Sequence, residues 1–360
     1  MTKGRIAGEV RIVGAGLLGA SIGLVLARNG VDVSLVDVSP TAVTLAVEYG
    51  AGRPASPTDN PTLIIVCVPP DVAADTIARE LEAFPNAVVT DVTSVKEAIS
   101  ESLIARGADM ARYVGSHPMA GRERGGAIAA RADIFTGRAW ILCADESTDP
   151  AAIRLVEDLA TDCGATPVHL AAAEHDAAVA LVSHVPQIVS SAVAASLIGA
   201  SDDAVALAGG GLRDVTRVAS SDPALWVQIL SANAGPVADV LRGIRSNLDG
   251  VISALESGAS AGAIATLMAR GNSGVSRIPG KHGRSHRFAQ ILVIIDDRPG
   301  QLAALLTEIG SLGVNMEDLR LEHSPGAQVG FAEISVLPEA EERLVADLEA
   351  RGWRIASEEA

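Results

Sequence analysis

The sequence predicts an α/β protein with three parts in series, and three observations support this prediction. From Val10 to about Leu170, short β-branched runs alternate with helix-length segments, which is typical of βαβ units and a mainly parallel sheet. From Ala171 to about Met268, alanine-rich segments of helical period follow one another without a convincing strand, which predicts an all-α part. The C-terminal segment then predicts strands and helices in the order βαββαβ, the split βαβ or ferredoxin-like arrangement.

The first part begins with a strand and a glycine-rich turn that opens a helix running to about Arg28. Its expected strands are short apolar runs that lie one after another between helices: Val10–Val13, Val33–Val36, Leu63–Val68, Ala87–Thr90, Tyr113–Gly115, Ala139–Cys143 and Thr166–Leu170. The second part opens with a long helix in which Pro186 removes one backbone hydrogen bond, so we expect a kink there.

A Gly- and Ser-rich basic segment, Arg270–Arg287, is typical of a linker. Three hundred and sixty residues are too many for one ordinary core, so we expect separate domains. Their predicted boundaries are 1–170, 171–272, 273–287 for the linker, and 288–360. Within the last domain we expect strands and helices at Ala289–Ile295, Pro299–Leu312, Met316–Glu322, Val329–Leu337, Ala340–Arg351 and Trp353–Ala356.

Composition restricts the class of partner and the compartment. The formal net charge is −16, so a polyanion such as DNA or an acidic bilayer would on average be repelled. The three cysteines, Cys67, Cys143 and Cys163, form no CxxC pair, which favours a reducing cytoplasm. Residues 1–9 contain no apolar signal core, and no uninterrupted run of about 18 apolar residues indicates a membrane span.

A nucleotide site is predicted at Gly14-Ala15-Gly16-Leu17-Leu18-Gly19, which matches GxGxxG directly after the first strand, a Rossmann-like arrangement. The glycines permit a tight turn and close approach to a pyrophosphate at the helix N-terminus. Asp37 ends the second strand 23 residues after Gly14, where a carboxylate can bind both ribose hydroxyls. Asp37 could instead cap the next helix, but Ser39 before Pro40 suits that role better. A carboxylate there would repel the 2′-phosphate of NADP, so we expect NAD.

His117 is the candidate proton acceptor. It lies in Gly115-Ser116-His117-Pro118-Met119-Ala120-Gly121, and we expect it on a short loop after the strand Tyr113–Gly115. Ser94 follows the strand Ala87–Thr90 at the carboxyl edge, where open α/β sheets place their ligands, and its hydroxyl could fix the imidazole tautomer. The alternative is an ordinary loop histidine bonded to a neighbouring carbonyl.

Two arginines indicate an anion site in the helical part. Arg213 and Arg217 follow the glycine run Gly209-Gly210-Gly211 and are four residues apart, so on a helix both guanidinium groups share one face. Alternatively, Asp214 pairs locally with Arg217 and no ligand is involved. A metal site is not predicted, because His175 and His184 are nine residues apart and lie about half a revolution from each other on a regular helix.

Together these residues resemble the prephenate dehydrogenase family, which includes the arogenate and cyclohexadienyl dehydrogenases. The resemblance covers about residues 10 to 270, where GAGLLGAS, DVTSVK, GSHPMAGRE, HDAAVALVSHVP and LRDVTRVASSDPALW stand in family order. It implies oxidative decarboxylation of prephenate to 4-hydroxyphenylpyruvate with reduction of NAD, a step towards tyrosine.

The resemblance also implies a role for each matching residue. His117 matches the catalytic histidine that accepts the ring-hydroxyl proton, and Ser94 matches the serine that holds its imidazole. His184 and Arg217 match a pocket histidine and the arginine that binds a substrate carboxylate. Two further residues, Arg213 and Glu123, match a second basic group and an acidic residue at the mouth of the site.

The sequence departs from the family pattern at two positions, because Gln187 replaces a frequent second histidine and Arg122 replaces a small or polar residue. The choice between prephenate and arogenate is therefore open, with prephenate favoured. A β-hydroxyacid dehydrogenase is disfavoured, because that family uses a lysine on its helical domain and residues 171–272 contain none. A non-catalytic NAD-responsive regulator remains a further alternative, but it leaves His117 unexplained.

The C-terminal segment resembles an ACT regulatory domain, through the phrases DDRPGQLAALL and LGVNMEDLRL. That resemblance implies an amino-acid ligand near Gly300 and Asn315, with tyrosine as the natural feedback candidate, although a purely dimerising module is equally compatible. The apolar faces of the alanine-rich helices, together with the family resemblance, predict a homodimer.

Overall fold

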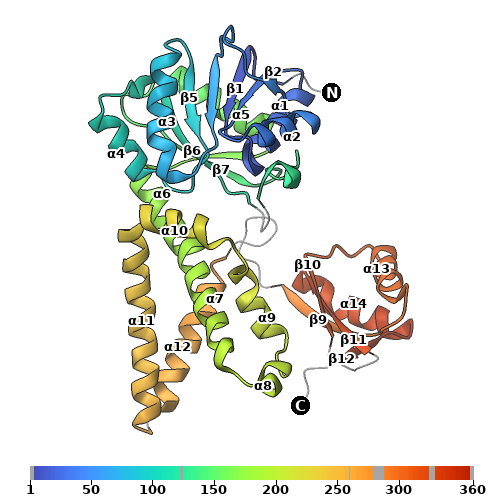
Figure 1. Ribbon diagram of the computed structural model, residues 1–360. Coiled ribbons are helices and arrows are strands. Elements are labelled where there is room, and N and C mark those ends of the chain that lie inside the picture. The colour runs from blue at the N-terminus through green and yellow to red at the C-terminus, as the bar shows by residue number, and fades with distance from the viewer. Residues whose placement is uncertain (1–3, 122–124, 259, 279–287, 324–328, 357–360) are drawn as a thin grey trace. The chain divides into compact units, whose positions relative to one another are not determined.

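Figure 1 shows the computed structural model, which describes most of the chain. The chain divides into two compact units. The described residues are 4–121, 125–258, 260–278, 288–323 and 329–356. The first unit contains residues 1–200 and 215–244, and the second contains residues 201–214 and 245–360.

The first unit is built on an eight-stranded sheet with the order β3-β2-β1-β4-β5-β6-β7-β8. All neighbouring strands are parallel except β6 and β7, which are antiparallel, so the mainly parallel sheet expected from the sequence is observed. The strands are β1 (Glu9–Val13), β2 (Asp32–Val36), β3 (Arg53–Pro54), β4 (Leu63–Val66), β5 (Val88–Asp91), β6 (Tyr113–Pro118), β7 (Ala139–Cys143) and β8 (Thr166–His169).

Helices cover both faces of this sheet, which explains why its central strands are continuous apolar runs. All four residues of β4 are buried. One face packs against α1 (Leu17–Arg28), α2 (Pro40–Glu48) and α5 (Pro150–Asp162), through buried residues such as Leu26 and Val156. The other face packs against α3 (Pro70–Ala83) and α4 (Glu97–Ala105), through Ile77 and Leu103.

The helical segments follow β8, and their first helix changes character in the middle. It begins as α6 (Ala172–Val179), passes through the π-helical segment Ala180–His184, and continues as α7 (Val185–Ala195). Pro186 lies in the first turn of α7, so the irregularity falls next to the proline as the sequence predicts. The helices that follow are α8 (Asp202–Ala206), α9 (Gly210–Thr216), α10 (Pro223–Ala232), α11 (Ala234–Glu256) and α12 (Ser260–Val275).

The helix Ala172–Gly199 is, among the described residues, long and apolar enough to cross a membrane by length and composition alone. Its 28 residues include an 18-residue window with a mean hydropathy of 1.5, although the run is interrupted by polar side chains. Three of these, His175, Asp176 and His184, are almost completely buried against the rest of the first unit. A core helix of a globular fold passes the same test; here 33% of the window is buried, and the buried part includes these polar groups.

The second unit contains a four-stranded antiparallel sheet with the order β10-β11-β9-β12. Its strands are β9 (Ala289–Asp296), β10 (Asp318–His323), β11 (Val329–Val336) and β12 (Arg354–Ala356). Two helices, α13 (Gln301–Ser311) and α14 (Pro338–Ala350), give the element order βαββαβ that the sequence predicts. Their buried leucines, Leu305 and Leu344, belong to the same apolar core as the inward face of β9.

Three expectations need correction. His117 lies inside β6, which continues to Pro118 because it pairs with β7, and is therefore not on a loop. The expected linker from Arg270 is wrong in its first residues, because α12 continues to Val275 with a bond from Ser273 Oγ to the Ala269 carbonyl. The strand β3 was not expected, since two residues that include a proline carry no periodic signal. The later part of that linker, residues 279–287, lies outside the described residues.

Candidate active site

In the glycine-rich turn between β1 and α1, Gly16 leaves space for an anion, whereas Gly14 and Gly19 are closely packed. Gly14 has φ +107°, and a Cβ there would lie 2.3 Å from the Cys67 carbonyl oxygen. A Cβ on Gly19 would lie 1.9 Å from the Gly14 carbonyl oxygen, so both glycines are required by close packing. Gly16 has no atom within 4 Å of its ideal Cβ position and caps α1 without a side-chain hydrogen bond. The open N-terminus of α1 therefore fits a pyrophosphate.

Asp37 stands beside this turn at the end of β2. Its Oδ2 accepts a hydrogen bond from the Ala15 N–H at 2.7 Å, and its Oδ1 accepts one from the Ser39 N–H at 2.8 Å. The helix cap is Ser39, whose Oγ accepts from the Ala42 N–H, as the sequence predicts. Leu17 and Leu18, the other candidate cofactor residues, form the start of α1 and pack partly against the core.

His117 is half-buried at the carboxyl end of β6, and its ring is held by another histidine. His117 Nδ1 lies 2.9 Å from His175 Nε2, and His175 Nδ1 lies 2.7 Å from Asp176 Oδ1. Desolvation lowers the pKa of His117 well below its ordinary value, and the nearby His175, Lys96 and His184 lower it further. The imidazole is therefore neutral at neutral pH and able to accept a proton.

The partner of the His117 ring differs from the one expected. Ser94 lies in the turn between β5 and α4, as the sequence predicts, but among the described residues no hydrogen bond joins Ser94 to His117. The ring Nδ1 instead contacts His175, which comes from a helix 58 residues further along the chain. The structure thus assigns to His175 the contact by which Ser94 was expected to fix the tautomer.

A buried ion pair supports the floor of the site. Lys96 Nζ is bonded to Asp91 Oδ1, and both side chains are almost completely buried. Asp91 also accepts hydrogen bonds from the Tyr113 hydroxyl at 2.7 Å and from the Thr93 hydroxyl at 2.5 Å. Because Asp91 ends β5 and Tyr113 begins β6, this network fixes the loop before α4 against the strand that carries His117.

His184 is the second buried histidine of the site. Its Nδ1 lies 3.0 Å from Asn233 Nδ2, which also donates to the Asp176 carbonyl at 2.8 Å. The ring of Trp226 meets the His184 ring edge to face, with centroids 6.0 Å apart. Desolvation lowers the pKa of His184 to about 4, although Asp176 opposes the shift. Because an amide N–H₂ only donates, Nδ1 of the neutral ring is the acceptor and Nε2 carries the hydrogen.

The remaining candidates for substrate binding are less enclosed. Arg217 is exposed and, within the described part of the chain, forms no ion pair. Arg213 and Arg217 do not lie on one α-helix, because α9 ends at Thr216 and Arg217 begins a 3-10 turn, and the expectation that they share one face stays a prediction. Arg213 lies exposed on α9. Glu123 and Arg122 lie outside the described residues.

The sequence reasoning missed His175, Asp176, Lys96 and Asn233. It considered His175 only as a metal ligand together with His184 and excluded that pair by assuming a regular helix, but a π-helical segment lies between them. Each of these two histidines influences the titration of the same neighbour, His117. The adjacent pair of a histidine and an aspartate in HDAAVALVSHVP was the available signal. Among the described residues, no group of three or more His, Cys, Asp or Glu side chains has a metal-binding arrangement.

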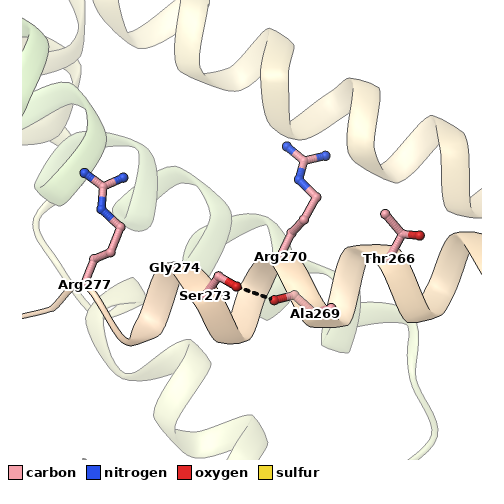
Figure 2. Close-up of a pocket in the computed structure, with 6 residues that line it drawn as sticks. All are labelled: Thr266, Ala269, Arg270, Ser273, Gly274 and Arg277. Atoms are coloured by element: carbon pink, nitrogen blue, oxygen red, sulfur yellow. Dashed lines mark hydrogen bonds between the residues drawn. The ribbon is translucent and has the colours of Figure 1, made fainter. Parts of the chain in front are cut away.

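A hollow of about 570 Å³ lies on the second unit, away from all of these residues in the sequence (Figure 2). Its lining residues are all exposed; five of them lie on α12, and Arg277 lies two residues after the end of that helix. Arg270 donates to Asn247 Oδ1 at 3.3 Å. A surface hollow of this kind, without a buried polar group, is not a candidate active site.

The candidate regulatory residues are both exposed in the second unit. Gly300 caps α13 with φ +90°, a left-handed conformation that favours glycine. Asn315 lies before β10 and donates from Nδ2 to Glu317 Oε1 at 2.8 Å.

Comparison with known families gives two adjacent matches. Residues 22–169 match the model described as the nucleotide-binding domain of prephenate dehydrogenase, and residues 171–269 match the model described as its dimerization domain. The glycine-rich turn precedes the first match, and residues after 269 lie outside both.

Individual proteins give the same likeness. A probable prephenate dehydrogenase of Streptomyces niveus is 36% identical over 353 residues, which cover 95% of this chain and 98% of that protein. The crystal structure of prephenate dehydrogenase from Aquifex aeolicus, in complex with hydroxyphenyl propionate and NAD+, matches with a TM-score of 0.68 and 26% identity, covering 75% of this chain and 98% of that one. Arogenate dehydrogenase from Synechocystis matches with a TM-score of 0.63 and 27% identity, covering 75% and 100% of the two chains.

Proposed function

Because the chain belongs to the prephenate dehydrogenase family and is an oxidoreductase of that type, we propose that it catalyses the NAD-dependent oxidative decarboxylation of prephenate to 4-hydroxyphenylpyruvate. The observation that carries this proposal is the neutral, half-buried His117 imidazole at the carboxyl edge of the sheet, with His175 behind it. Loss of carbon dioxide and a hydride makes the ring aromatic, so no covalent nucleophile is needed. Positioning and one proton acceptor suffice.

The cofactor residues fit NAD. Gly16 leaves space at the N-terminus of α1 for a pyrophosphate, and the carboxylate of Asp37 lies next to the same turn, within reach of the Ala15 N–H. Asp37 would accept from the ribose hydroxyls and would repel a 2′-phosphate, which supports NAD over NADP. When bound there, NAD supplies the hydride acceptor for the reaction.

The chain's own residues then hold the substrate and move one proton. His117 accepts the ring-hydroxyl proton, and Arg217 is free to bind a carboxylate through its planar guanidinium group. His184 offers a neutral N–H donor from Nε2. Family resemblance adds Ser94 beside the imidazole, and Arg213 and Glu123 near the substrate.

Arogenate is the second candidate substrate, because the Aquifex prephenate dehydrogenase and the Synechocystis arogenate dehydrogenase are about equally similar to this chain. The two substrates differ in a keto acid or amino acid side chain. Gln187, which replaces a family histidine, is buried on α7 and contacts Ser221 and Ser191 at 3.4 Å. A neutral amide there places no charge opposite the keto acid, which is compatible with prephenate.

The wider organisation follows from the same family. We propose a homodimer through the helices of residues 171–272, with 1–170 as the nucleotide-binding domain, 273–287 as a linker and 288–360 as an ACT-like regulatory domain that takes tyrosine. The strand and helix order of the C-terminal sheet supports the last assignment. Three free cysteines support a reducing cytoplasm, and the net charge of −16 argues against nucleic acid as a partner.

The experiment follows NADH formation with prephenate and arogenate side by side, each with NAD and with NADP. We expect turnover with prephenate and NAD, and a fall in kcat of roughly two to four orders of magnitude in His117→Asn, the usual scale of acid-base assistance. His169→Asn, an exposed histidine bonded to Glu157, serves as the matched control. Cofactor binding without any turnover would instead favour the non-catalytic regulator, and near-normal turnover in His117→Asn would exclude the mechanism.

A further inference from the structure

A chain of hydrogen-bond contacts leads from His117 through His175 to the carboxylate of Asp176. His117 Nδ1, His175 Nε2, His175 Nδ1 and Asp176 Oδ1 follow one another through contacts of 2.9 Å and 2.7 Å. His175 and Asp176 are almost completely buried, so water does not compete for these bonds. The proposed function assigns the proton transfer to His117 and gives His175 and Asp176 no part in it.

This chain of contacts ends at Asp176, because every group that contacts its carboxylate donates a hydrogen bond to it. Its Oδ1 accepts from the Lys96 N–H and its Oδ2 from the Glu97 N–H, both at 2.9 Å. Backbone N–H groups cannot accept, so both oxygens are already committed as acceptors. The remaining contact, to His175 Nδ1, is therefore one in which His175 donates.

This direction fixes the hydrogen on each ring in turn. A neutral His175 with its hydrogen on Nδ1 has an acceptor lone pair on Nε2. His117 must then donate from Nδ1, which leaves the lone pair of its Nε2 free. From this geometry we propose that His175 and Asp176 are positioning residues that hold His117 in the one neutral tautomer whose Nε2 can take the substrate's hydroxyl proton; the proposal rests on the proposed function.

The contacts behind His117 also stabilise the imidazolium that the proton transfer would form. When Nε2 of His117 has taken the proton, the ring is cationic and its Nδ1–H bond to His175 strengthens, because hydrogen bonds with one charged partner are stronger. The carboxylate of Asp176 lies behind His175 and favours that positive charge. The transferred proton stays on His117 Nε2 until the ring is deprotonated, so no additional reactant is required.

His175 is the better residue to substitute, because Asp176 also caps α4 and its loss would confound catalysis with folding. His175→Leu removes the acceptor that faces His117. His175→Gln retains a carbonyl oxygen at a similar distance from the backbone and can accept from Nδ1. His169→Gln is the matched control, since His169 is exposed on β8 and its Nε2 contacts Glu157 Oε1 on α5.

Two measurements test the proposal. The first is the tautomer of His117 in the wild-type protein, read from ring ¹⁵N shifts and two-bond ¹H–¹⁵N couplings; the seven histidines of the chain are assigned by substitution. We expect the hydrogen on Nδ1. The second is steady-state kinetics, where His175→Leu should lose roughly a hundredfold or more in kcat with little change in KM, and His175→Gln should recover at least about tenfold of that loss.

A wild-type His117 with its hydrogen on Nε2 would overturn the proposal, as would a folded His175→Leu protein with the wild-type kcat. If His175→Leu does not fold, the wild-type tautomer and the His175→Gln kinetics decide. Failure of the proposed function is seen separately, because a wild-type protein that turns over neither prephenate nor arogenate still reports its tautomer.

Discussion

The charge state of His117 follows from what surrounds its ring. Burial removes the water that would stabilise an imidazolium and lowers the pKa of His117, and the nearby His175, Lys96 and His184 lower it further. Lys96 is held in place by Asp91, so its ammonium cannot move away. This environment keeps His117 unprotonated at neutral pH, as the proposed role of proton acceptor requires.

The first prediction concerns pH. A proton acceptor works only when neutral, so lowering the pKa of His117 moves the loss of activity to lower pH. We expect kcat/KM to stay level as pH falls through the ordinary histidine value of about 6.5 and to decline only below it. The measurement is kcat/KM against pH, with a neutral re-assay after each acidic incubation to exclude unfolding. A half-maximal point at or above that ordinary value would contradict the prediction.

The second prediction concerns Arg217, the exposed guanidinium assigned to a substrate carboxylate. Arg217→Ala should raise KM for prephenate by roughly ten- to a hundredfold, because a hydrogen bond to a charged group contributes about 1.5–3 kcal/mol. Arg217→Lys retains the charge but not the planar guanidinium group, so its KM should lie between those of the wild type and Arg217→Ala. Arg270→Ala, an exposed arginine on α12, is the control. An unchanged KM in Arg217→Ala would remove Arg217 from the binding site.

The sequence predicts those candidate site residues whose proposed role depends on local pattern. Gly14, Gly16 and Asp37 follow from a turn of fixed spacing, and His117 from its place after an expected strand. His175 could not be predicted by the same reasoning, because its contact with His117 joins two elements 58 residues apart. The phase of the intervening helix also depends on a π segment, which no residue pattern specified.

At the scale of elements, the turn between β1 and α1 contains one glycine that close packing requires, Gly19, and another that leaves space for the cofactor, Gly16. Our third prediction separates them. Gly19→Ala places a Cβ 1.9 Å from the Gly14 carbonyl and should lower the free energy of unfolding by about 1–3 kcal/mol. Gly16→Ala meets no atom within 4 Å and should change stability by less than about 0.5 kcal/mol, while raising KM for NAD.

Thermal or denaturant unfolding without cofactor, together with KM for NAD, measures both effects. The two variants are controls for each other, because they make the same substitution three residues apart. If Gly16→Ala bound NAD as tightly as the wild type, the pyrophosphate would lie elsewhere. If Gly19→Ala were as stable as the wild type, the close approach would be relieved by a small shift of the turn.

Strands and helices were predicted well where one periodic signal covers the whole element. The fully buried β4, expected as part of Leu63–Val68, is of this kind, because two covered sheet faces require continuous apolar runs. The extension of β6 to Pro118 was not predicted, since it depends on pairing with β7. The extension of α12 past Arg270 was also not predicted, because glycines and serines disfavour helix locally although the chain continues the helix to Val275.

At the scale of the whole molecule, the exposed apolar side chains lie largely on the helical segments. In the first unit, Leu181 and Val182 on the π segment and Val227 on α10 are more than 60% exposed. Side chains of this size are favoured in an interface rather than in water, and the matching family model describes a dimerization domain. Exposed apolar side chains contribute to the high mean hydropathy of the helix Ala172–Gly199, whose other side chains include the buried His175 and His184.

The last prediction concerns the C-terminal sheet, for which regulation by tyrosine and simple dimerisation are both compatible with the element order. If the domain is regulatory, tyrosine should inhibit NADH formation by the full chain. Asn315→Ala should then raise the half-inhibitory tyrosine concentration by roughly tenfold, the loss of about one hydrogen bond to a charged group, and leave the uninhibited kcat unchanged.

Asn60→Ala, an exposed asparagine of the first unit, is the matched control and should respond to tyrosine as the wild type does. No inhibition of the wild type at millimolar tyrosine would contradict feedback by this amino acid. Mass measurement in solution then separates the alternatives. If the C-terminal domain only dimerises, a chain that ends at Ile278 should form a smaller oligomer and have the same kcat. A regulatory domain instead predicts that the shortened chain keeps its turnover and no longer responds to tyrosine.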